Sequence, residues 1–174
     1  MKNTIKFLAI ILISITFQSC DDIEDLADVN FNTTINEKIA FHVDQNQEAI
    51  SESITLSIDN SDTHDYLNNL ERVSITKFTY KIIDFIGDEE GSVNITFFVD
   101  GVSLSQESFI VKQVNDDATI FEITDTNKLN TIASTLKNNH QITASISGTS
   151  TAINDSMDFK VDITINLSIV ANPL

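Results

Sequence analysis

The alternation of apolar and polar residues near the C-terminus constrains the fold more than any other feature of this 174-residue sequence. From Met157 to Ile169, every odd-numbered residue is apolar and every even-numbered residue is polar. A repeat of two residues is typical of a β-strand that buries one face. Because this strand is so regular, we expect it at the centre of a sheet and not at an edge. The preceding alternating run, residues 141–147, is its expected pairing partner.

Shorter runs with the same period occur along the rest of the chain, and they begin near Val29, Ile39, Ile54 and Val93. Asp100-Gly101 lies between two such runs and is typical of a tight hairpin turn, because both turn residues take positive φ. The alternation changes phase in two places, between Ile75 and Phe78 and between Leu104 and Phe109–Val111. Such changes indicate β-bulges or strands that cross between sheets.

One segment has the period of a helix. Leu129, Ile132, Ala133 and Leu136 form an apolar stripe with helical spacing, and a shorter helical turn is expected at residues 63–70. The chain is therefore predicted to be all-β: an antiparallel β-sandwich, Ig-like or related, of eight or nine strands. The amphipathic helix is expected to cover an open end, and residues 29–174 are expected to form the whole domain.

The N-terminus has the layout of a secretory signal. Lys2 and Lys6 precede the apolar run 7–15, and the small residue Ser19 comes directly before Cys20. The apolar run is about half of the roughly 20 residues that a membrane-spanning helix requires. The sequence therefore predicts a cleaved signal peptide at residues 1–19 and no permanent membrane span.

The segment Phe17-Gln18-Ser19-Cys20 resembles the lipobox of bacterial lipoproteins, although Phe17 and Gln18 depart from the usual leucine and small residue. The resemblance implies that the Cys20 sulfur carries a diacylglycerol and that its new amino terminus is acylated. Several acyl chains hold a protein on a membrane where a single chain is marginal. The alternative is a plain signal peptide with an incidental cysteine.

Residues 20–28 follow as a lipidated cysteine and an acidic tether, CDDIEDLAD. An acidic run at this place is similar to the surface-export signal of Bacteroidota lipoproteins, which implies an outer-membrane anchor on the cell surface. The periplasmic face is the alternative. In the enterobacterial scheme, Asp21 would instead favour retention in the inner membrane. The run also has a simpler interpretation as a solvated spacer, because like charges repel and stay extended.

Charge and aromatic content exclude some partners. The chain has 10 basic and 26 acidic residues, and loss of Lys2 and Lys6 with the signal leaves a net charge of −18. This charge opposes binding to nucleic acid and to anionic lipid. Tryptophan is absent and only Tyr66 and Tyr80 are tyrosines. This composition disfavours a carbohydrate-binding module, because exposed tryptophan and tyrosine rings commonly bind sugars.

The sequence contains no catalytic pattern. His42, His64 and His140 are far apart and lack zinc-ligand spacing, and no Gly-x-Ser-x-Gly motif occurs. No catalytic residue, metal ligand or cofactor is therefore predicted. The weak calcium candidates are the carboxylates near Gly87 and Gly91, which are Asp84, Asp88, Glu89 and Glu90. A solvated turn is the favoured interpretation of these four acids.

These observations predict a non-enzymatic binding, adhesion or structural accessory module, held on the membrane through Cys20. Its partner would be an envelope protein or a glycan, and not a nucleic acid. One alternative is a carbohydrate-binding module, which an exposed groove containing Tyr66 or Tyr80 would support. The other is a carboxylate-based hydrolase, which a cleft with two close, partly buried acids would support.

Overall fold

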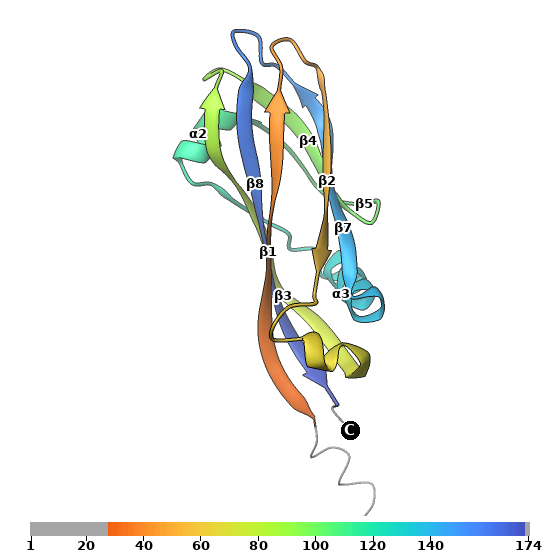
Figure 1. Cartoon of the computed structure of the whole chain (residues 1–174). Coiled ribbons are helices and arrows are strands. Elements are labelled where there is room, and N and C mark those ends of the chain that lie inside the picture. Colours follow the sequence, from red (N-terminus) through yellow and green to blue (C-terminus); the bar gives the residue numbers. More distant parts are fainter. Residues whose placement is uncertain (1–27, 173–174) are drawn as a thin grey trace, which may run out of the picture.

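The computed structural model describes residues 28–172, which form two four-stranded antiparallel sheets packed face to face (Figure 1). Sheet A has the strand order β1-β8-β3-β6 and sheet B has the order β2-β7-β4-β5. The predicted signal peptide, Cys20 and all of the acidic tether except Asp28 lie outside the described residues.

Within residues 28–172 the chain forms eight strands and three helical segments, with the following bounds. Sheet A contains β1 (Val29–Val43), β3 (Leu70–Gly87), β6 (Ile120–Glu122) and β8 (Met157–Ala171). Sheet B contains β2 (Ala49–Ser57), β4 (Ser92–Val99), β5 (Val102–Ile110) and β7 (Gln141–Ser150). The helical segments are η1 (His64–Asn69), α2 (Val111–Asp116) and α3 (Thr126–Asn139).

The predicted antiparallel β-sandwich is confirmed. Its strand order pairs the first strand with the last, the second with the seventh, the third with the sixth and the fourth with the fifth, across two sheets of four. This is the arrangement of a jelly roll. It is related to the immunoglobulin sandwich, in which seven or nine strands are divided differently between the sheets.

The last strand, β8, lies at the centre of sheet A between β1 and β3, as its regular alternation predicts. The prediction that it pairs with residues 141–147 is wrong. Those residues belong to β7, which pairs with β2 and β4 in sheet B. The six residues 151–156 carry the chain from one sheet to the other and do not close a hairpin. The buried faces of β7 and β8 therefore lie in opposite sheets, across one shared core.

Both predicted phase changes are β-bulges. The register of β3 against β8 shifts between Ile75 and Lys77. Phe97 and Phe98 of β4 pair with Ser105 and Ser103 of β5, so that Leu104 is the additional residue in β5. The second run ends earlier than expected, because Val111 begins helix α2 and is not a strand residue.

The turn and helix predictions also hold. Asp100 and Gly101 have φ values of 47° and 79°, which is the positive pair that the hairpin requires. Asp125 caps the N-terminus of helix α3, and its carboxylate accepts hydrogen bonds from the N–H groups of Asn127 and Lys128. Its apolar stripe is buried, and the helix contacts β3 of sheet A and β7 of sheet B. Helix α3 thus covers an opening between the two sheets.

The sandwich is elongated, and its two ends differ (Figure 1). The start of β1, the segment η1 and the end of β8 lie together at one end, which we call the tether end. Residues 44–48, 88–91 and 151–156 connect strands at the opposite end, which we call the loop end. No helix within residues 28–172 has the length and apolar character needed to cross a membrane.

Candidate functional site

Asp88, one of the calcium candidates, joins two loops at the loop end. Its Oδ2 accepts hydrogen bonds from the N–H groups of Ile153 and Asn154, both at 2.9 Å. Its Oδ1 accepts from the N–H of Glu90 at 3.1 Å and from Nδ2 of Asn154 at 3.2 Å. These hydrogen bonds, led by the one from the Asn154 backbone, hold the pKa of Asp88 below its ordinary value. Both carboxylate oxygens are therefore engaged by protein donors.

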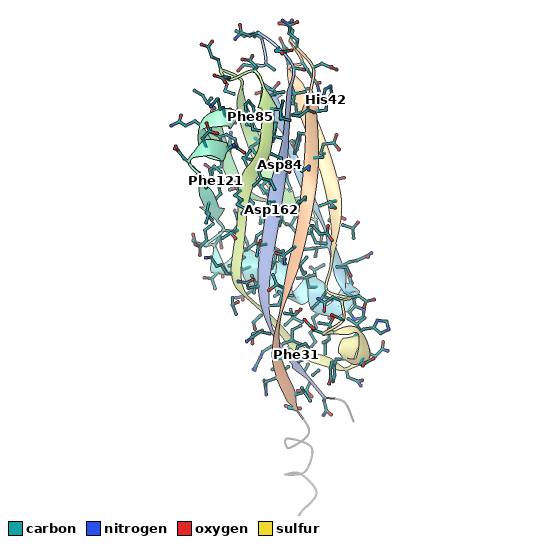
Figure 2. The ribbon with its side chains drawn as sticks, turned by 60° about the vertical axis from the view of Figure 1, so that its left-hand side comes forward. Phe31, His42, Asp84, Phe85, Phe121 and Asp162 are labelled. Carbon is teal, nitrogen blue, oxygen red and sulfur yellow. The ribbon has the colours of Figure 1, made fainter. Side chains whose placement is uncertain are left out.

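Of the other three candidates, only Glu90 shares a partner with Asp88, because both carboxylates accept from Nδ2 of Asn154. Asp84 lies on the outer face of sheet A (Figure 2), where its Oδ2 is 2.9 Å from Nζ of Lys160. The hydrogen bond to Lys160 lowers the pKa of Asp84. The Glu90 carboxylate reaches Nδ2 of Asn154 at 3.5 Å, and Glu89 is exposed. Across residues 28–172, no three His, Cys, Asp or Glu side chains are placed to hold one metal ion.

The loop end is tied together by backbone hydrogen bonds. The N–H of Asn46 donates to the carbonyl of Ala152 at 2.6 Å, and the N–H of Ser150 donates to the carbonyl of Glu48 at 2.8 Å. The N–H of Asp88 donates to the carbonyl of Ser156 at 3.1 Å. The three loops therefore support one another, although the sequence showed only that they are polar.

Tyr80 is not available as a sugar-binding platform. Its side chain is 1% exposed, and its ring is stacked between Phe97 and Phe121 with centroid distances of 5.0 Å. Its hydroxyl is 2.9 Å from Oγ of Ser105. Burial raises the pKa of Tyr80 to about 12. Tyr80 is therefore a core residue whose hydroxyl is satisfied internally.

Tyr66 lines a shallow hollow at the tether end. The hollow has a volume of about 410 Å³ and is also lined by Val29, Phe31, Asn32 and Asp62. The rings of Tyr66 and Phe31 are 5.3 Å apart between centroids and tilted by 41°. Of the two tyrosines, Tyr66 is therefore the one that lines a surface hollow. Its tyrosine ring is half-buried because it packs against Phe31 and the core.

Two further hollows hold one carboxylate each. The larger, of about 530 Å³, lies between α3 and the Asp100 turn, and Asp100 there already accepts a hydrogen bond from the N–H of Thr143 at 2.8 Å. The smaller, of about 170 Å³, contains Asp162. A glycosidase needs two carboxylates that flank one bond. Neither of these hollows, nor the Tyr66 hollow with its single Asp62, supplies such a pair.

The outer face of sheet A carries side chains that bind one another across neighbouring strands (Figure 2). Nδ1 of His42 is 2.7 Å from Oδ1 of Asp158, and Nζ of Lys81 is 3.6 Å from Oδ2 of Asp162. With Lys160 and Asp84, these pairs form three contacts between a basic and an acidic side chain on adjacent strands. The hydrogen bond to Asp158 raises the pKa of His42.

Hydroxyl and amide groups on the same face are paired as well. Oγ1 of Thr34 donates to Oδ1 of Asn166 at 3.2 Å, and Oγ1 of Thr164 donates to Oδ1 of Asn36 at 3.1 Å. The outer face of sheet A therefore uses much of its hydrogen-bonding capacity within itself.

The outer face of sheet B carries no charge. The outward positions follow from the strand register and the alternation of burial, and all of their side chains are exposed or half-exposed. They are Ala49, Ser51, Ser53, Thr55 and Ser57 of β2; Gln141, Thr143, Ser145, Ser147 and Thr149 of β7; Ser92, Asn94, Thr96 and Phe98 of β4; and Ser103, Gln106, Ser108 and Ile110 of β5.

Most polar groups of this face point to solvent without a partner. Nε2 of Gln106 donates to Oδ1 of Asn94 at the long distance of 3.4 Å. Within residues 28–172, the hydroxyls of Thr96, Ser145 and Ser147 have no hydrogen-bond partner in the protein. Sequence reasoning missed this face. Its signal was the Ser/Thr spacing in residues 51–57 and 143–149, but only the fold shows that these two runs are adjacent strands.

Comparison with known proteins adds no family. No protein-family model matches the sequence, and no curated protein sequence matches it. A decameric BFDV capsid protein superposes with a TM-score of 0.49 at 8% identity, over 81% of this chain and 99% of that chain. The Desmodium yellow mottle tymovirus structure gives a TM-score of 0.40 at 12% identity, over 81% of this chain and 84% of that chain. Likenesses at this level carry no argument about function, and the jelly-roll assignment rests on the strand order itself.

Proposed function

We propose that the chain is an outer-membrane lipoprotein, anchored through lipid on Cys20, whose β-sandwich is a non-enzymatic binding module of the cell envelope. The observation that carries the proposal is that the N-terminal segment enters the sandwich at one end, whereas the connected loops lie at the opposite end. The acidic tether that follows Cys20 leads into β1 at the tether end, and the connected loops lie at the far end of the sandwich (Figure 1). A domain anchored at the tether end would present its loops and both sheet faces away from the lipid.

Two features support a binding role over catalysis. The hollows around Tyr66, Asp100 and Asp162 each contain a single carboxylate. The buried carboxylate of Asp88 is occupied by loop donors and serves to connect the loops. A rigid sandwich that positions loops and flat faces is a common frame for recognition.

The anchor is tested by Cys20→Ala in the full chain. Because Cys20 is the only cysteine, the variant should lose incorporation of labelled palmitate and move from the membrane fraction to the soluble fraction. Asp25→Ala is the matched control, and it should keep both the label and the membrane location. Recovery of Cys20→Ala in the membrane fraction at the wild-type level would refute the anchor.

Protease treatment of intact cells then decides the face of the membrane. Loss of the domain from intact cells places it on the cell surface, and protection places it on the periplasmic face. Either outcome is compatible with the anchor.

A further inference from the structure

We propose that the outer face of sheet B is the binding surface of this module and that its ligand is an uncharged polysaccharide chain. The proposal rests on the binding role proposed above and names the surface and the chemical class of the ligand.

The first argument is the distribution of charge. With the signal removed the chain has a net charge of −18, yet none of the outward side chains of β2, β7, β4 and β5 is charged. Transferring a charged side chain out of water is costly unless it is paired. Because this face has no charged side chain, a ligand can cover it without removing a charge from water. The remaining acidic surface repels anionic polymers at longer range, and the face itself offers no carboxylate to pair with a cationic one, which favours an uncharged ligand.

The second argument is unused hydrogen-bonding capacity. A serine or threonine hydroxyl can both donate and accept, and those of Thr96, Ser145 and Ser147 have no partner in the described chain. Outward side chains repeat about every 7 Å along a strand and about every 4.8 Å between strands. Sugar hydroxyls also donate and accept. A polysaccharide lying on this face can therefore pair with a regular array of protein hydroxyls.

The third argument is the position of Phe98. This residue is the only aromatic one on the face, and β4, its strand, lies between β7 and β5. It pairs with Ser145 on one side and Ser103 on the other, so its half-exposed ring lies among hydroxyls. The apolar C–H side of a sugar ring packs on such a ring while the sugar hydroxyls reach the neighbouring serines.

The same face does not suit a protein partner or a second copy of the chain. Protein interfaces are stabilised by buried aromatic, methionine and arginine side chains, and Phe98 is the only residue of these kinds here. Two copies would also each bring the same large negative charge. A polymer is favoured over a single sugar because the face is about 15 Å wide and about 30 Å long, by the usual spacings of strands and residues.

The experiment measures co-sedimentation of the full chain with insoluble polysaccharides. The protein is kept in a zwitterionic detergent without a sugar head group, so that the detergent does not compete. The probes are the uncharged polymers cellulose, chitin, mannan and a β-1,3-glucan, together with cross-linked polygalacturonate as an anionic polymer. We expect retention on at least one uncharged polymer and none on polygalacturonate.

Variants on the two sheet faces locate the site. Ser145→Asp and Thr96→Asp place a charge on the outer face of sheet B, and Phe98→Ala removes its ring. Each should weaken binding by at least about tenfold, which corresponds to about 1.4 kcal/mol. Thr164→Asp places the same charge on the outer face of sheet A and should bind as the wild type does. Matching circular dichroism and melting temperatures show that all four variants are folded.

The outcomes that overturn the proposal are distinct. They are absence of binding to every uncharged polymer, equal loss in Thr164→Asp, and self-association that the sheet B variants abolish in sedimentation velocity. Because the palmitate label and the membrane location are measured separately, failure of polysaccharide binding leaves the anchor standing, and failure of the anchor leaves the binding result standing.

Discussion

The outer faces of the two sheets have the same backbone geometry and opposite chemistry. On sheet A, basic and acidic side chains of neighbouring strands contact one another in three pairs: His42–Asp158, Lys160–Asp84 and Lys81–Asp162. On sheet B, serine and threonine hydroxyls point outward, and several have no protein partner. The difference teaches that one face uses much of its hydrogen-bonding capacity in contacts within itself, whereas the other leaves most of its hydroxyls without a protein partner.

The pairs on sheet A contribute only modestly to stability. Ion pairs on an exposed face add little to the free energy of unfolding, because water and salt screen them. Their larger consequence is that a partner would have to break them. We therefore expect substitutions on the outer face of sheet A to leave ligand binding unchanged and substitutions on the outer face of sheet B to weaken it.

The largest expected effect is on folding, and it distinguishes the inner face of β8 from its outer face. Ile163 of β8 is fully buried at 0% exposure, so Ile163→Asp should prevent folding, because an unpaired charge would enter the core. Thr164→Asp changes the next residue, on the outer face, and should fold cooperatively. Circular dichroism during thermal unfolding checks both variants. A soluble, cooperatively folded Ile163→Asp would mean that the buried face of β8 is assigned incorrectly.

A second pair of variants makes the same comparison between inner and outer faces on sheet B, where Phe97 and Phe98 are adjacent residues of β4. Phe97 is 1% exposed and contacts the rings of Phe78 and Tyr80. Phe97→Ala should lower the free energy of unfolding by about 3–5 kcal/mol, as large-to-small changes in cores do. Phe98→Ala should cost much less, because the ring lies on the outer face. Urea unfolding measures both, and equal losses would contradict the assignment of Phe98 to that face.

The smallest effect is a pH dependence that only sheet A should show. The pKa of His42 is raised by Asp158 in the folded protein. The resulting stabilisation is fully present below the unfolded pKa, about 6.5, and is lost as the pH rises through the folded pKa. His42→Gln should therefore lower the melting temperature slightly at pH 5.5 and leave it unchanged at pH 9.

Ser147→Ala on sheet B is the matched control for this pH dependence. Its melting temperature relative to wild type should not vary with pH, because no titrating group contacts that hydroxyl in the described chain. A pH-independent effect of His42→Gln would refute the contribution of the His42–Asp158 pair.

The sequence could predict the local structure well. The spacing of Leu129, Ile132 and Leu136 located α3, and Asp100-Gly101 located a hairpin whose φ values agree. These features depend on residues close together in the chain, where propensity and periodicity act directly. Helix α2 was missed because its six residues are too few to show a helical repeat.

The candidate site was harder to predict from the sequence than the local structure was. Asp88 was noticed as a carboxylate near two glycines, but its donors at residues 153 and 154 lie more than sixty positions away in the chain. Likewise, Tyr80 was considered for a groove, whereas the register of β3 with β6 places it opposite Phe121 inside the sandwich.

The sequence by itself determined which residues of each strand are buried, because a repeat of two residues specifies one inner and one outer face. It therefore also determined which residues of each strand could appear on the surface. Only the tertiary structure decided which strands are neighbours. Backbone hydrogen bonds between strands are the same for any pair of residues, and the partners here are far apart in the chain, so that β1 pairs with β8 and β2 with β7. The uncharged outer face of sheet B exists because that pairing places four separate polar stripes side by side.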